Sequence, residues 1–363
     1  MVSIIIPVKK INDYIRESVP KILELDYPDF EIIIVPDDTT SVSRQNASLL
    51  SLRGAPTHWG RGRRSNPTLT QSKKIRIIPS GPVGPAEKRD LAAGHTRGDI
   101  LAFLDDDAYP RRDWLKRAVK HFSNPRVAAV GGPAITPAND TTGQKISGAV
   151  FESYLGGGGA RNRYLSIGRA KEIDDWPTVN LLVRKDVFVK IGGFDCAYWP
   201  GEDTKLCLDI IETGHNIIYE PYAVVYHHRR AGVLKHLKQI GNYALHRGYF
   251  AKRHPKTSLK LAYFVPTLFV LYLIALVILS PSGGEGSGPR FFTHDPIGVG
   301  IQNDILLVPL AVYLLGLFAD AIIVSTRWRN PLIGLATIPI IFLTHIWYGL
   351  RLIWGLMTPR IVR

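Results

Sequence analysis

The sequence is poor in cysteine and carries no evident secretion signal. Cys196 and Cys207 are the only cysteines among 363 residues, and their spacing is not that of a metal site. A framework of disulfide bonds is therefore unsupported, and we expect a reducing compartment. The apolar run at residues 2–7 is too short for a signal peptide, and no basic stretch precedes it. We therefore expect the N-terminal region to stay on the cytoplasmic side.

Acidic residues are in the minority. The chain has 45 lysines and arginines but 31 aspartates and glutamates, which gives a net charge of +14. A balance this basic suits nucleic acid, anionic lipid or a phosphate-bearing substrate. No basic groove with interleaved aromatic residues and no known reader motif is present, so we do not expect binding of nucleic acid. An anionic membrane surface explains the charge better, because each nearby Lys or Arg contributes about 1 kcal/mol there.

Charged residues are almost absent from long stretches of the last third of the chain. Residues 261–280 contain none and are long enough to cross a hydrocarbon core of about 30 Å. Residues 305–325 and 331–357 are two further candidates. The positive-inside rule places the arginines at 327–329 in the cytoplasm, together with the N-terminal domain. Three crossings would leave Arg360 outside, which the rule disfavours, so the third segment either overrides the rule or is re-entrant or interfacial.

The chain divides into three regions by composition. Residues 234–254 combine many basic side chains with Tyr243, Tyr249 and Phe250. A helix in the membrane interface fits this mixture, and a soluble surface helix is the alternative. We therefore expect a folded domain over 1–230, an amphipathic interfacial region over 231–258, and a transmembrane region with two to three helices over 259–363.

The first region alternates apolar strands with helical patterns. Strands are predicted where short β-branched runs end at turn residues, over 2–8, 30–35, 75–79, 100–104 and 127–130. Helices are predicted over 12–25, 85–95 and 113–122. Because the strands are apolar throughout, we expect an α/β fold whose mostly parallel central sheet is covered on both faces. Residues 51–73 and 131–160 show no period and are predicted to be loops.

Three adjacent acidic residues give the sharpest chemical signal. Asp105, Asp106 and Asp107 directly follow the predicted strand 100–104, at the edge where open α/β sheets bind ligands. Neighbouring carboxylates repel one another, and a cation would compensate them. Oxygen ligands favour Mg²⁺ or Mn²⁺, which share their coordination with substrate phosphates. The alternative is a helix cap ahead of Asp113.

Two pairs near the N-terminus are weaker candidates. Asp37 and Asp38 follow a predicted strand and would reach the same edge, where they could accept hydrogen bonds from a base or a ribose. Such pairs are also common in turns. Lys88 and Arg89 open a predicted helix and either meet a diphosphate or form a solvated face.

Two later groups also have alternative interpretations. Glu202 and Asp203 follow an aromatic stretch, and they either supply a general base or cap the helix predicted at 204–213. The run His227-His228-Arg229-Arg230 either completes a metal and phosphate site or provides interfacial charge.

In this order, the motifs resemble those of glycosyltransferase family 2. The resemblance covers roughly residues 1–230, and it is carried by Pro7 at the end of the first strand, Val35-Pro36-Asp37-Asp38, Gly84 with Lys88-Arg89, the stretch from Gly98 to Asp107, and Gly192-Gly193-Phe194-Asp195 followed by Gly201-Glu202-Asp203. The family implies a GT-A fold, a nucleotide-sugar donor bound with Mg²⁺ or Mn²⁺, and an inverting single displacement.

The resemblance also implies a role for each matched residue. Asp203 would be the catalytic base that deprotonates the acceptor hydroxyl, and Asp107 would bind the metal. His228, or its neighbour His227, resembles a histidine that some relatives use near the metal and diphosphate, and we assign His228 to the metal site. The other matched residues would bind the nucleotide sugar: Pro7, Asp37, Asp38, Lys88, Arg89, Asp105, Asp106 and Glu202.

The sequence departs from the family pattern in two places. Thr39-Thr40 replace the usual Gly-Ser after the first Asp pair, so contacts with the base and ribose could differ. Processive relatives carry Gln-x-x-Arg-Trp after the catalytic base, and the nearest match here, at 239–243, lacks both Arg and Trp. We therefore predict transfer of a single sugar.

The combined prediction is a metal-dependent, hexosyltransferase-like enzyme of the cell membrane, multi-pass, with its catalytic domain on the cytoplasmic side. Its acceptor would be a hydroxyl of a lipid-linked or membrane-proximal glycan, as in cell-envelope polysaccharide synthesis. A polyprenyl-phosphate sugar transferase and a non-catalytic membrane scaffold with a nucleotide-binding fold are the alternatives.

Overall fold

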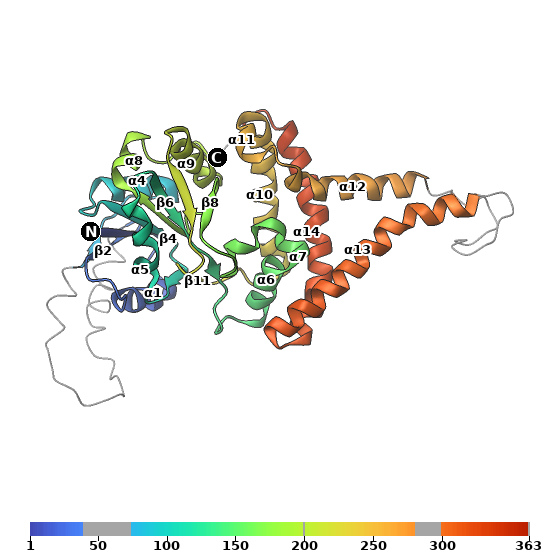
Figure 1. Ribbon diagram of the computed structural model, residues 1–363, viewed down its shortest axis with the longest axis horizontal. Coiled ribbons are helices and arrows are strands. Elements are labelled where there is room, and N and C mark those ends of the chain that lie inside the picture. Colours follow the sequence, from blue (N-terminus) through green and yellow to red (C-terminus); the bar gives the residue numbers. More distant parts are fainter. Residues whose placement is uncertain (39–73, 199, 280–298, 362–363) are drawn as a thin grey trace. The chain divides into compact units, whose positions relative to one another are not determined.

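A computed structural model describes residues 1–38, 74–198, 200–279 and 299–361 (Figure 1). Within these residues the chain forms two compact units, one from 1–139 and 162–228, the other from 140–161 and from 229 onwards. The second unit therefore includes a segment from the middle of the region that the sequence assigns to one domain. The predicted loop at 51–73 lies outside the described residues.

The first unit is built on a mixed sheet with the strand order β3-β2-β1-β4-β9-β6-β10-β8. In chain order these strands are β1 (Val2–Pro7), β2 (Phe30–Val35), β3 (Ile75–Ile77), β4 (Ile100–Leu104), β6 (Val127–Gly131), β8 (Lys171–Ile173), β9 (Asn180–Arg184) and β10 (Asn216–Tyr219). Strands β3, β2, β1 and β4 are parallel neighbours, and β6 is parallel to β10. Strand β9 is antiparallel to β4 and β6, and β8 is antiparallel to β10.

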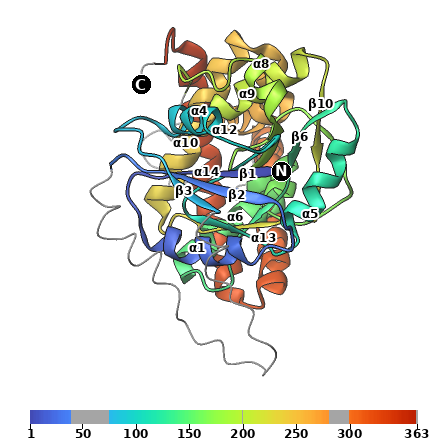
Figure 2. The same ribbon diagram turned by 90° about the vertical axis from the view of Figure 1, so that its left-hand side faces the viewer.

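Helices cover both faces of this sheet (Figure 2). On one face, Ile4 and Ile6 of β1 belong to a core with α1 (Asp13–Leu23) and α5 (Trp114–Val119), which continues into η2 (Lys120–Ser123). On the other face, Ile5 belongs to a core with α4 (Pro85–Gly94), α8 (Lys185–Lys190) and α9 (Glu202–Glu212). Alternate residues of the same strand are thus buried on opposite sides, which explains the continuous apolar run and confirms the predicted α/β class.

A small second sheet belongs to the same unit. It places β11 (Val225–His227) between β5 (Ala108–Pro110) and β7 (Ala134–Ile135). Strand β11 is antiparallel to β5 and parallel to β7. Because β5 starts directly after Asp107 and its first residue pairs with His227, the register brings these two side chains together.

The second unit is helical. Its elements are α6 (Thr142–Glu152), α7 (Tyr154–Gly157), α10 (Val233–Arg253), α11 (Pro255–Ser258), α12 (Leu261–Leu279), α13 (Val299–Trp328) and α14 (Pro331–Met357), and η3 (Gly158–Arg163) follows α7. By length and composition, α12, α14 and residues 306–328 of α13 could each cross a membrane, as predicted. Helix α10 forms where the amphipathic helix is predicted.

The predicted loop at 131–160 is wrong, because α6 and α7 lie within it. Helix α6 begins with a capping box in which Thr141 and Gln144 bond each other's backbone N–H. Ile146, Ala149 and Val150 follow at helical spacing and pack on α13 and α14. Both the capping box and this spacing are visible in the sequence and predict a helix.

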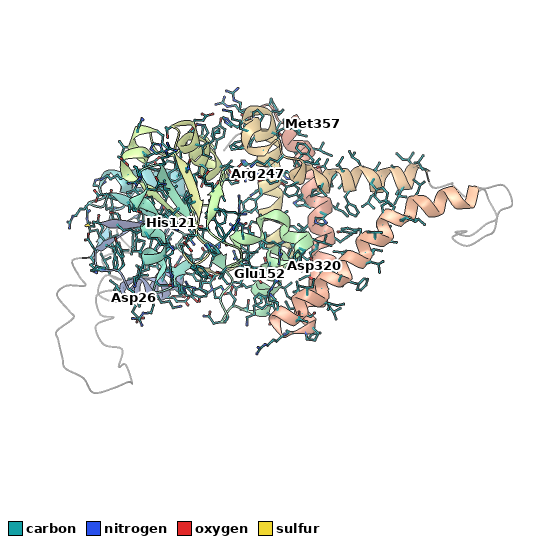
Figure 3. The ribbon with its side chains drawn as sticks, viewed as in Figure 1. Asp26, His121, Glu152, Arg247, Asp320 and Met357 are labelled. Atoms are coloured by element: carbon teal, nitrogen blue, oxygen red, sulfur yellow. The ribbon has the colours of Figure 1, made fainter. Side chains whose placement is uncertain are left out.

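Two carboxylates fix α6 and α7 within the second unit (Figure 3). Asp320 of α13 accepts the backbone N–H groups of Tyr154 and Leu155 at 2.9 and 2.8 Å. Glu152, at the end of α6, accepts the indole N–H of Trp328 at 3.2 Å. Both carboxylates are buried, and the bonds compensate for their loss of water.

Candidate active site

The acidic stretch after β4 lies at the carboxyl edge of the main sheet. Asp105, Asp107 and His227 are half-buried, and each offers one metal-ligand atom within 4.8 Å of the others. The His227 Nε2 atom is 3.1 Å from Asp107 Oδ1. Two carboxylates and one imidazole thus converge on a common point from the ends of β4 and β11.

The residues adjacent to these three are bonded to helix α1 instead. Asp106 accepts a hydrogen bond from the Asn12 amide at 2.6 Å, and Asn12 also caps α1 through the N–H of Ile15. His228 Nε2 lies 2.9 Å from Glu17 Oε2. The structure therefore places His227 rather than the assigned His228 beside Asp107, because successive residues of a strand point to opposite sides.

The surroundings of Asp106 disfavour its charged form. Burial raises the pKa of Asp106 to about 6, and the charges of Asp107 and Asp105 act in the same direction. The hydrogen bond from Asn12 opposes this shift. In the structure, Asp106 therefore serves to attach the acidic stretch to α1.

The basic pair of α4 is buried, so the solvated-face alternative is wrong. Lys88 donates from Nζ to the carbonyl oxygens of Val8 at 2.5 Å and Val35 at 3.4 Å, and it also pairs with Asp37. These bonds hold the cation at the carboxyl ends of β1 and β2. Pro7 ends β1 at this edge, and Asp38 follows Asp37 as a half-buried residue.

Arg89 joins the end of β4 to the start of α9. Its guanidinium donates to Asp105 at 2.7 Å and to Glu202 at 3.5 Å. The Arg89 Nε–H is buried and has no hydrogen-bond partner among the described residues. Burial and the charge of Asp203 raise the pKa of Glu202 to about 7, and Arg89 opposes this shift. Arg89 thus brings Glu202 and its neighbour Asp203 toward the acidic stretch.

Helix α9 begins at a glycine for a conformational reason. Gly201 precedes it with φ of 122°, which a side chain would strain. Glu202 and Asp203 form the first turn, and Asp203 accepts the backbone N–H of Thr204 at 2.7 Å. The helix N-terminus favours ionised carboxylates at these positions.

Two family models match the sequence over the part that carries this arrangement. The model of the family described as "Glycosyl transferase family 2" matches residues 3–183. The model described as "Glycosyl transferase family group 2" matches residues 100–360, and this second range is more than half of the chain. The chain belongs to glycosyl transferase family 2. The resemblance based on motifs alone is therefore confirmed.

Two curated relatives of this family 2 chain have named activities. The pre-mycofactocin glycosyltransferase of Mycobacterium tuberculosis is 31% identical over 172 residues, which are 47% of this chain and 36% of the relative. The glucosyl-dolichyl phosphate glucuronosyltransferase of Haloferax volcanii is 27% identical over 156 residues, which are 39% of this chain and 48% of the relative. The chain thus spans half or less of the length of these relatives.

A solved structure identifies the fold. The mannosyltransferase PcManGT from Pyrobaculum calidifontis, in complex with GDP-Man and Mn²⁺, superposes with a TM-score of 0.55 at 19% identity. The superposition covers 93% of this chain and 85% of the mannosyltransferase. The family 2 chain therefore has the GT-A fold.

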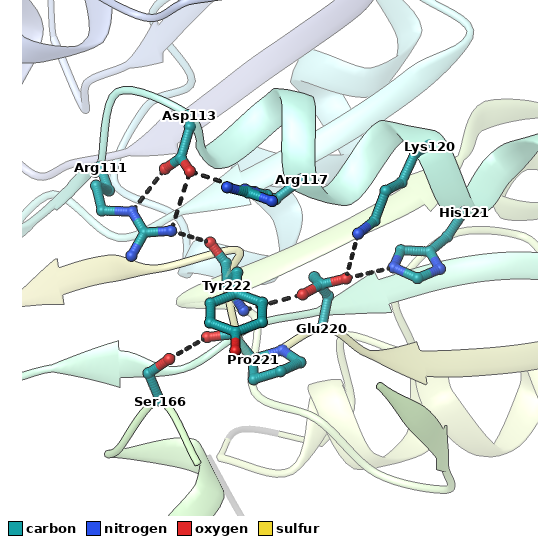
Figure 4. A network of polar contacts seen from close by, with 9 residues as sticks. All are labelled: Arg111, Asp113, Arg117, Lys120, His121, Ser166, Glu220, Pro221 and Tyr222. Atoms are coloured by element: carbon teal, nitrogen blue, oxygen red, sulfur yellow. Dashed lines mark hydrogen bonds and ion pairs between the residues drawn. The ribbon is translucent and has the colours of Figure 1, made fainter. Parts of the chain in front are cut away.

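Glu220, a buried carboxylate that the sequence analysis does not single out, joins the segment before β11 to η2. Glu220 Oε2 accepts from Lys120 at 2.9 Å and lies 2.7 Å from His121 Nε2, and Oε1 accepts the N–H of Tyr222 at 3.0 Å (Figure 4). Burial alone would raise the pKa of Glu220. The bonds from His121, Lys120 and Tyr222 hold that pKa below its usual value.

A second carboxylate extends this network. Arg111 contacts Asp113 at 2.6 and 3.1 Å and donates to the carbonyl of Tyr222 at 2.7 Å, while Arg117 donates to Asp113 at 2.9 Å (Figure 4). These bonds join the segment after β5 to the turn before β11. Since β5 follows Asp107 and β11 ends at His227, the network fixes the spacing of two of the three candidate ligands.

Asp90, which the sequence analysis does not single out, holds the turn at Gly192-Gly193 in this family 2 chain. Its Oδ1 accepts the backbone N–H of Phe194 at 3.0 Å, and its Oδ2 lies 3.4 Å from the Cys196 sulfur. A side chain on Gly193 would meet Asp90 Oδ1 at 2.6 Å, and the φ of 78° at Gly193 also favours glycine. The Gly192-Gly193 pair is the sequence signal for this turn, but its partner Asp90 lies about 100 residues away.

Proposed function

We propose that this chain is a glycosyltransferase that moves a single sugar from a nucleoside-diphosphate sugar to a hydroxyl of a lipid-linked or membrane-proximal glycan. The cluster of Asp105, Asp107 and His227 at the carboxyl edge of the sheet carries the proposal. Open α/β sheets bind ligands at this edge. Family membership supports the reaction class, and a protein of the same fold holds GDP-Man with Mn²⁺.

The three clustered side chains fit a divalent cation. Their ligand atoms lie within 4.8 Å of one another, and two of the three residues are carboxylates, which suit Mg²⁺ and Mn²⁺. We assign Asp105, Asp107 and His227 to this ion. A bound cation would neutralise the charge that develops on the departing nucleoside diphosphate.

Asp203 is the proposed catalytic base. It takes the proton of the acceptor hydroxyl as that oxygen forms its bond to the anomeric carbon. The carbon–oxygen bond to the diphosphate breaks on the opposite side, so the configuration at the anomeric carbon inverts. Arg89 holds the neighbouring Glu202, at 3.5 Å, and thereby positions the first turn of α9.

The remaining residues at this edge are proposed to bind the donor. Lys88 holds one oxygen of Asp37, which leaves the carboxylate oriented to accept from a base or ribose together with Asp38. Arg89 holds Asp105 at 2.7 Å at the point where the sugar and metal would meet. Pro7 would contribute through the backbone at the end of β1. Asp106 would contribute indirectly, because its bond with Asn12 attaches the acidic stretch to α1.

The acceptor is proposed from the helical unit and from the relatives. Helices that can cross a membrane would keep the enzyme beside lipid-linked substrates. The name of the Haloferax relative indicates that it acts on a glucosyl-dolichyl phosphate, which is such a substrate. The missing Arg and Trp of the processive motif favour one transfer per acceptor.

The proposal is tested first by a donor screen. Purified full-length protein in detergent is offered several nucleotide sugars with Mn²⁺, with Mg²⁺ and with a chelator, and hydrolysis or transfer is recorded. We expect metal-dependent turnover of one donor that Asp107→Ala abolishes and that Asp26→Ala, a change at an exposed aspartate, leaves intact. Failure of every donor to bind or react would favour the scaffold alternative.

A second variant identifies the acceptor chemistry. A hydroxyl needs a base, so Asp203→Asn should lower turnover roughly 10²–10⁴-fold. A polyprenyl phosphate is already ionised, so a mild effect of Asp203→Asn would instead indicate a phosphate acceptor. Donor binding measured in parallel shows whether the variant keeps its fold.

A further inference from the structure

Helices α12 and α13 form an antiparallel hairpin. The Tyr272 hydroxyl donates to the carbonyl of Leu306 at 2.6 Å, and the Phe269 ring lies 4.4 Å from the Tyr313 ring. The step from Phe269 forward to Tyr272 on α12 thus runs beside the step from Tyr313 back to Leu306 on α13, so the two helices run in opposite directions. If this hairpin crosses a membrane, the first turn of α12 and the last turn of α13 lie on the same face.

Helix α14 begins on this same face. Asn330 caps it only two residues after the end of α13, and Val324 packs with Ile333 across the connection. Further along, Tyr313 bonds His345 at 2.8 Å. From its start to His345, α14 thus follows α13 back from its end to Tyr313, taking the end of α13 as cytoplasmic.

The middle of α14 crosses the first half of α12. The Thr267 hydroxyl donates to the carbonyl of Gly349 at 3.2 Å, and the His345 ring lies 6.4 Å from that of Phe269. Position 269 is eight residues into α12, which is about 12 Å at a helical rise of 1.5 Å per residue. This depth is less than half of a hydrocarbon core of about 30 Å.

The end of α14 returns to the level at which α12 starts. A side chain on Gly248 of α10 would meet the carbonyl of Leu352 at 2.2 Å, and Lys252 donates to the carbonyl of Thr358 at 2.8 Å. Arg247, next to Gly248, donates to Ser258 at 3.3 Å and lies 4.8 Å from the ring of Tyr263, in the first turn of α12. Both ends of α14 are therefore on the face where α12 begins.

The charges of α10 support this placement. Helix α10 runs beside the second half of α14 and carries five lysines and arginines, at 235, 238, 247, 252 and 253. A Lys or Arg at the centre of a bilayer is energetically unfavourable. If α14 crossed the membrane, α10 would have to enter the hydrocarbon core with it. Arg351 of α14, which donates to Gly241 of α10 at 3.3 Å, adds to that cost.

One face of α14 remains apolar and exposed along its whole length. Its large exposed side chains are Leu332, Leu335, Leu343, Trp347, Leu350, Trp354 and Met357. At 100° per residue these positions fall within an arc of about 120°. An apolar stripe with two tryptophans, backed by a basic helix, suits the boundary between headgroups and acyl chains.

We propose that the chain crosses the membrane twice, through α12 and α13, and that α14 lies in the interface on the face from which α12 starts. The exposed stripe of α14 meets the acyl chains of that leaflet. Arg360, after α14, and Arg329, before it, are then on the same side, as the positive-inside rule requires. The inference concerns the helical unit alone and does not depend on the proposed reaction.

Cysteine labelling with a membrane-impermeant maleimide tests this topology. In a Cys196→Ser background, with the fully buried Cys207 left in place, single reporters are introduced as Arg329→Cys, Arg360→Cys and Ser287→Cys. Position 287 lies between α12 and α13 in the sequence. Each variant is labelled in right-side-out and in inside-out membrane vesicles, and vesicles opened with detergent give the total reactivity.

We expect the reporters at 329 and 360 to be labelled in the same kind of vesicle and the reporter at 287 in the other. Labelling of position 360 together with 287 would establish three crossings and overturn the proposal. A peptide tag fused after Arg363 gives an independent reading if position 360 reacts poorly. Its cleavage by protease in the vesicles that expose position 329 supports two crossings, and cleavage in the other kind refutes them.

Discussion

Replacing Glu220 by glutamine tests whether the network that leads to His227, a candidate metal ligand, stabilises the fold. The carboxylate is 2% exposed and receives bonds from Lys120 and His121. Glutamine keeps an acceptor for the N–H of Tyr222 but loses the charge. Because Lys120 is half exposed, its pair contributes only about 0.2–1 kcal/mol. The bond from His121 is better shielded, and hydrogen bonds to a charged group contribute about 1.5–3 kcal/mol.

The expected loss is therefore about 1.5–3 kcal/mol, which corresponds to a fall in Tm of roughly 3–12 °C for a domain of this size. Thermal unfolding in detergent, followed by tryptophan fluorescence, measures this shift. The exposed Glu24→Gln is the matched control and should leave Tm unchanged. Glu220→Gln should also bind Mn²⁺ more weakly than the wild type does, since Glu220 fixes the turn that leads to His227.

The contribution of Glu220 to the free energy of unfolding depends on pH with a definite sign. The pKa of Glu220 is lowered from its usual 4.5, so the folded state favours the charged form. Its contribution to the free energy of unfolding is present above pH 4.5 and is lost as the pH falls through the lower pKa of the folded state. Glu220→Gln should remove this part of the acid sensitivity. A variant with the Tm and acid profile of the wild type would refute the argument.

Three further outcomes follow from close contacts. Gly132→Ala should lower the free energy of unfolding by about 1–3 kcal/mol, because the new Cβ would lie 1.9 Å from the carbonyl oxygen of Ala223. Thermal unfolding measures this loss, and Gly143→Ala, whose Cβ would have no atom nearer than 3.7 Å, is the control that should be neutral. Asn12→Ala should lose about 1 kcal/mol of capping and also weaken Mn²⁺ binding measured by calorimetry, whereas Asn12→Ser should restore only the stability. Asp320→Asn can accept only one of its two backbone N–H groups well, so limited proteolysis should cut near α7 faster than in the wild type, and an unchanged rate would contradict this anchoring role.

Local patterns are sufficient to predict the parallel half of the sheet. Strand β4 and the three aspartates after it are adjacent in the chain, so a buried strand and its acidic end can be recognised together. The strand at Asn180–Arg184 lacks such a signal, because five residues with a short apolar run also fit a helix or a loop. Its place between β4 and β6 depends on pairing across the fold.

The candidate site is predictable in its residue types but not in its geometry. The sequence names His227 and His228 together, and only the register of β11 with β5 determines that His227 lies beside Asp107. Lys88 and Arg89 are named as cations, but their burial depends on Asp37, Asp105 and Glu202, which come from three separate elements. Asp90 and Glu220 have partners about 100 residues away, and no local pattern reports such pairs.

The interleaving of the two units limits how this protein can be divided. The chain passes from one unit to the other at residues 139–140, 161–162 and 228–229. A protein truncated after residue 228 would keep α6 but lose α13 and α14, which bury Ala149 and Val150. A soluble form therefore needs a second edit that replaces residues 140–161 with a short linker. For the same reason, a single recombination event cannot exchange the candidate membrane helices for others, since α6 and α7 must be inherited together with the helices on which they pack.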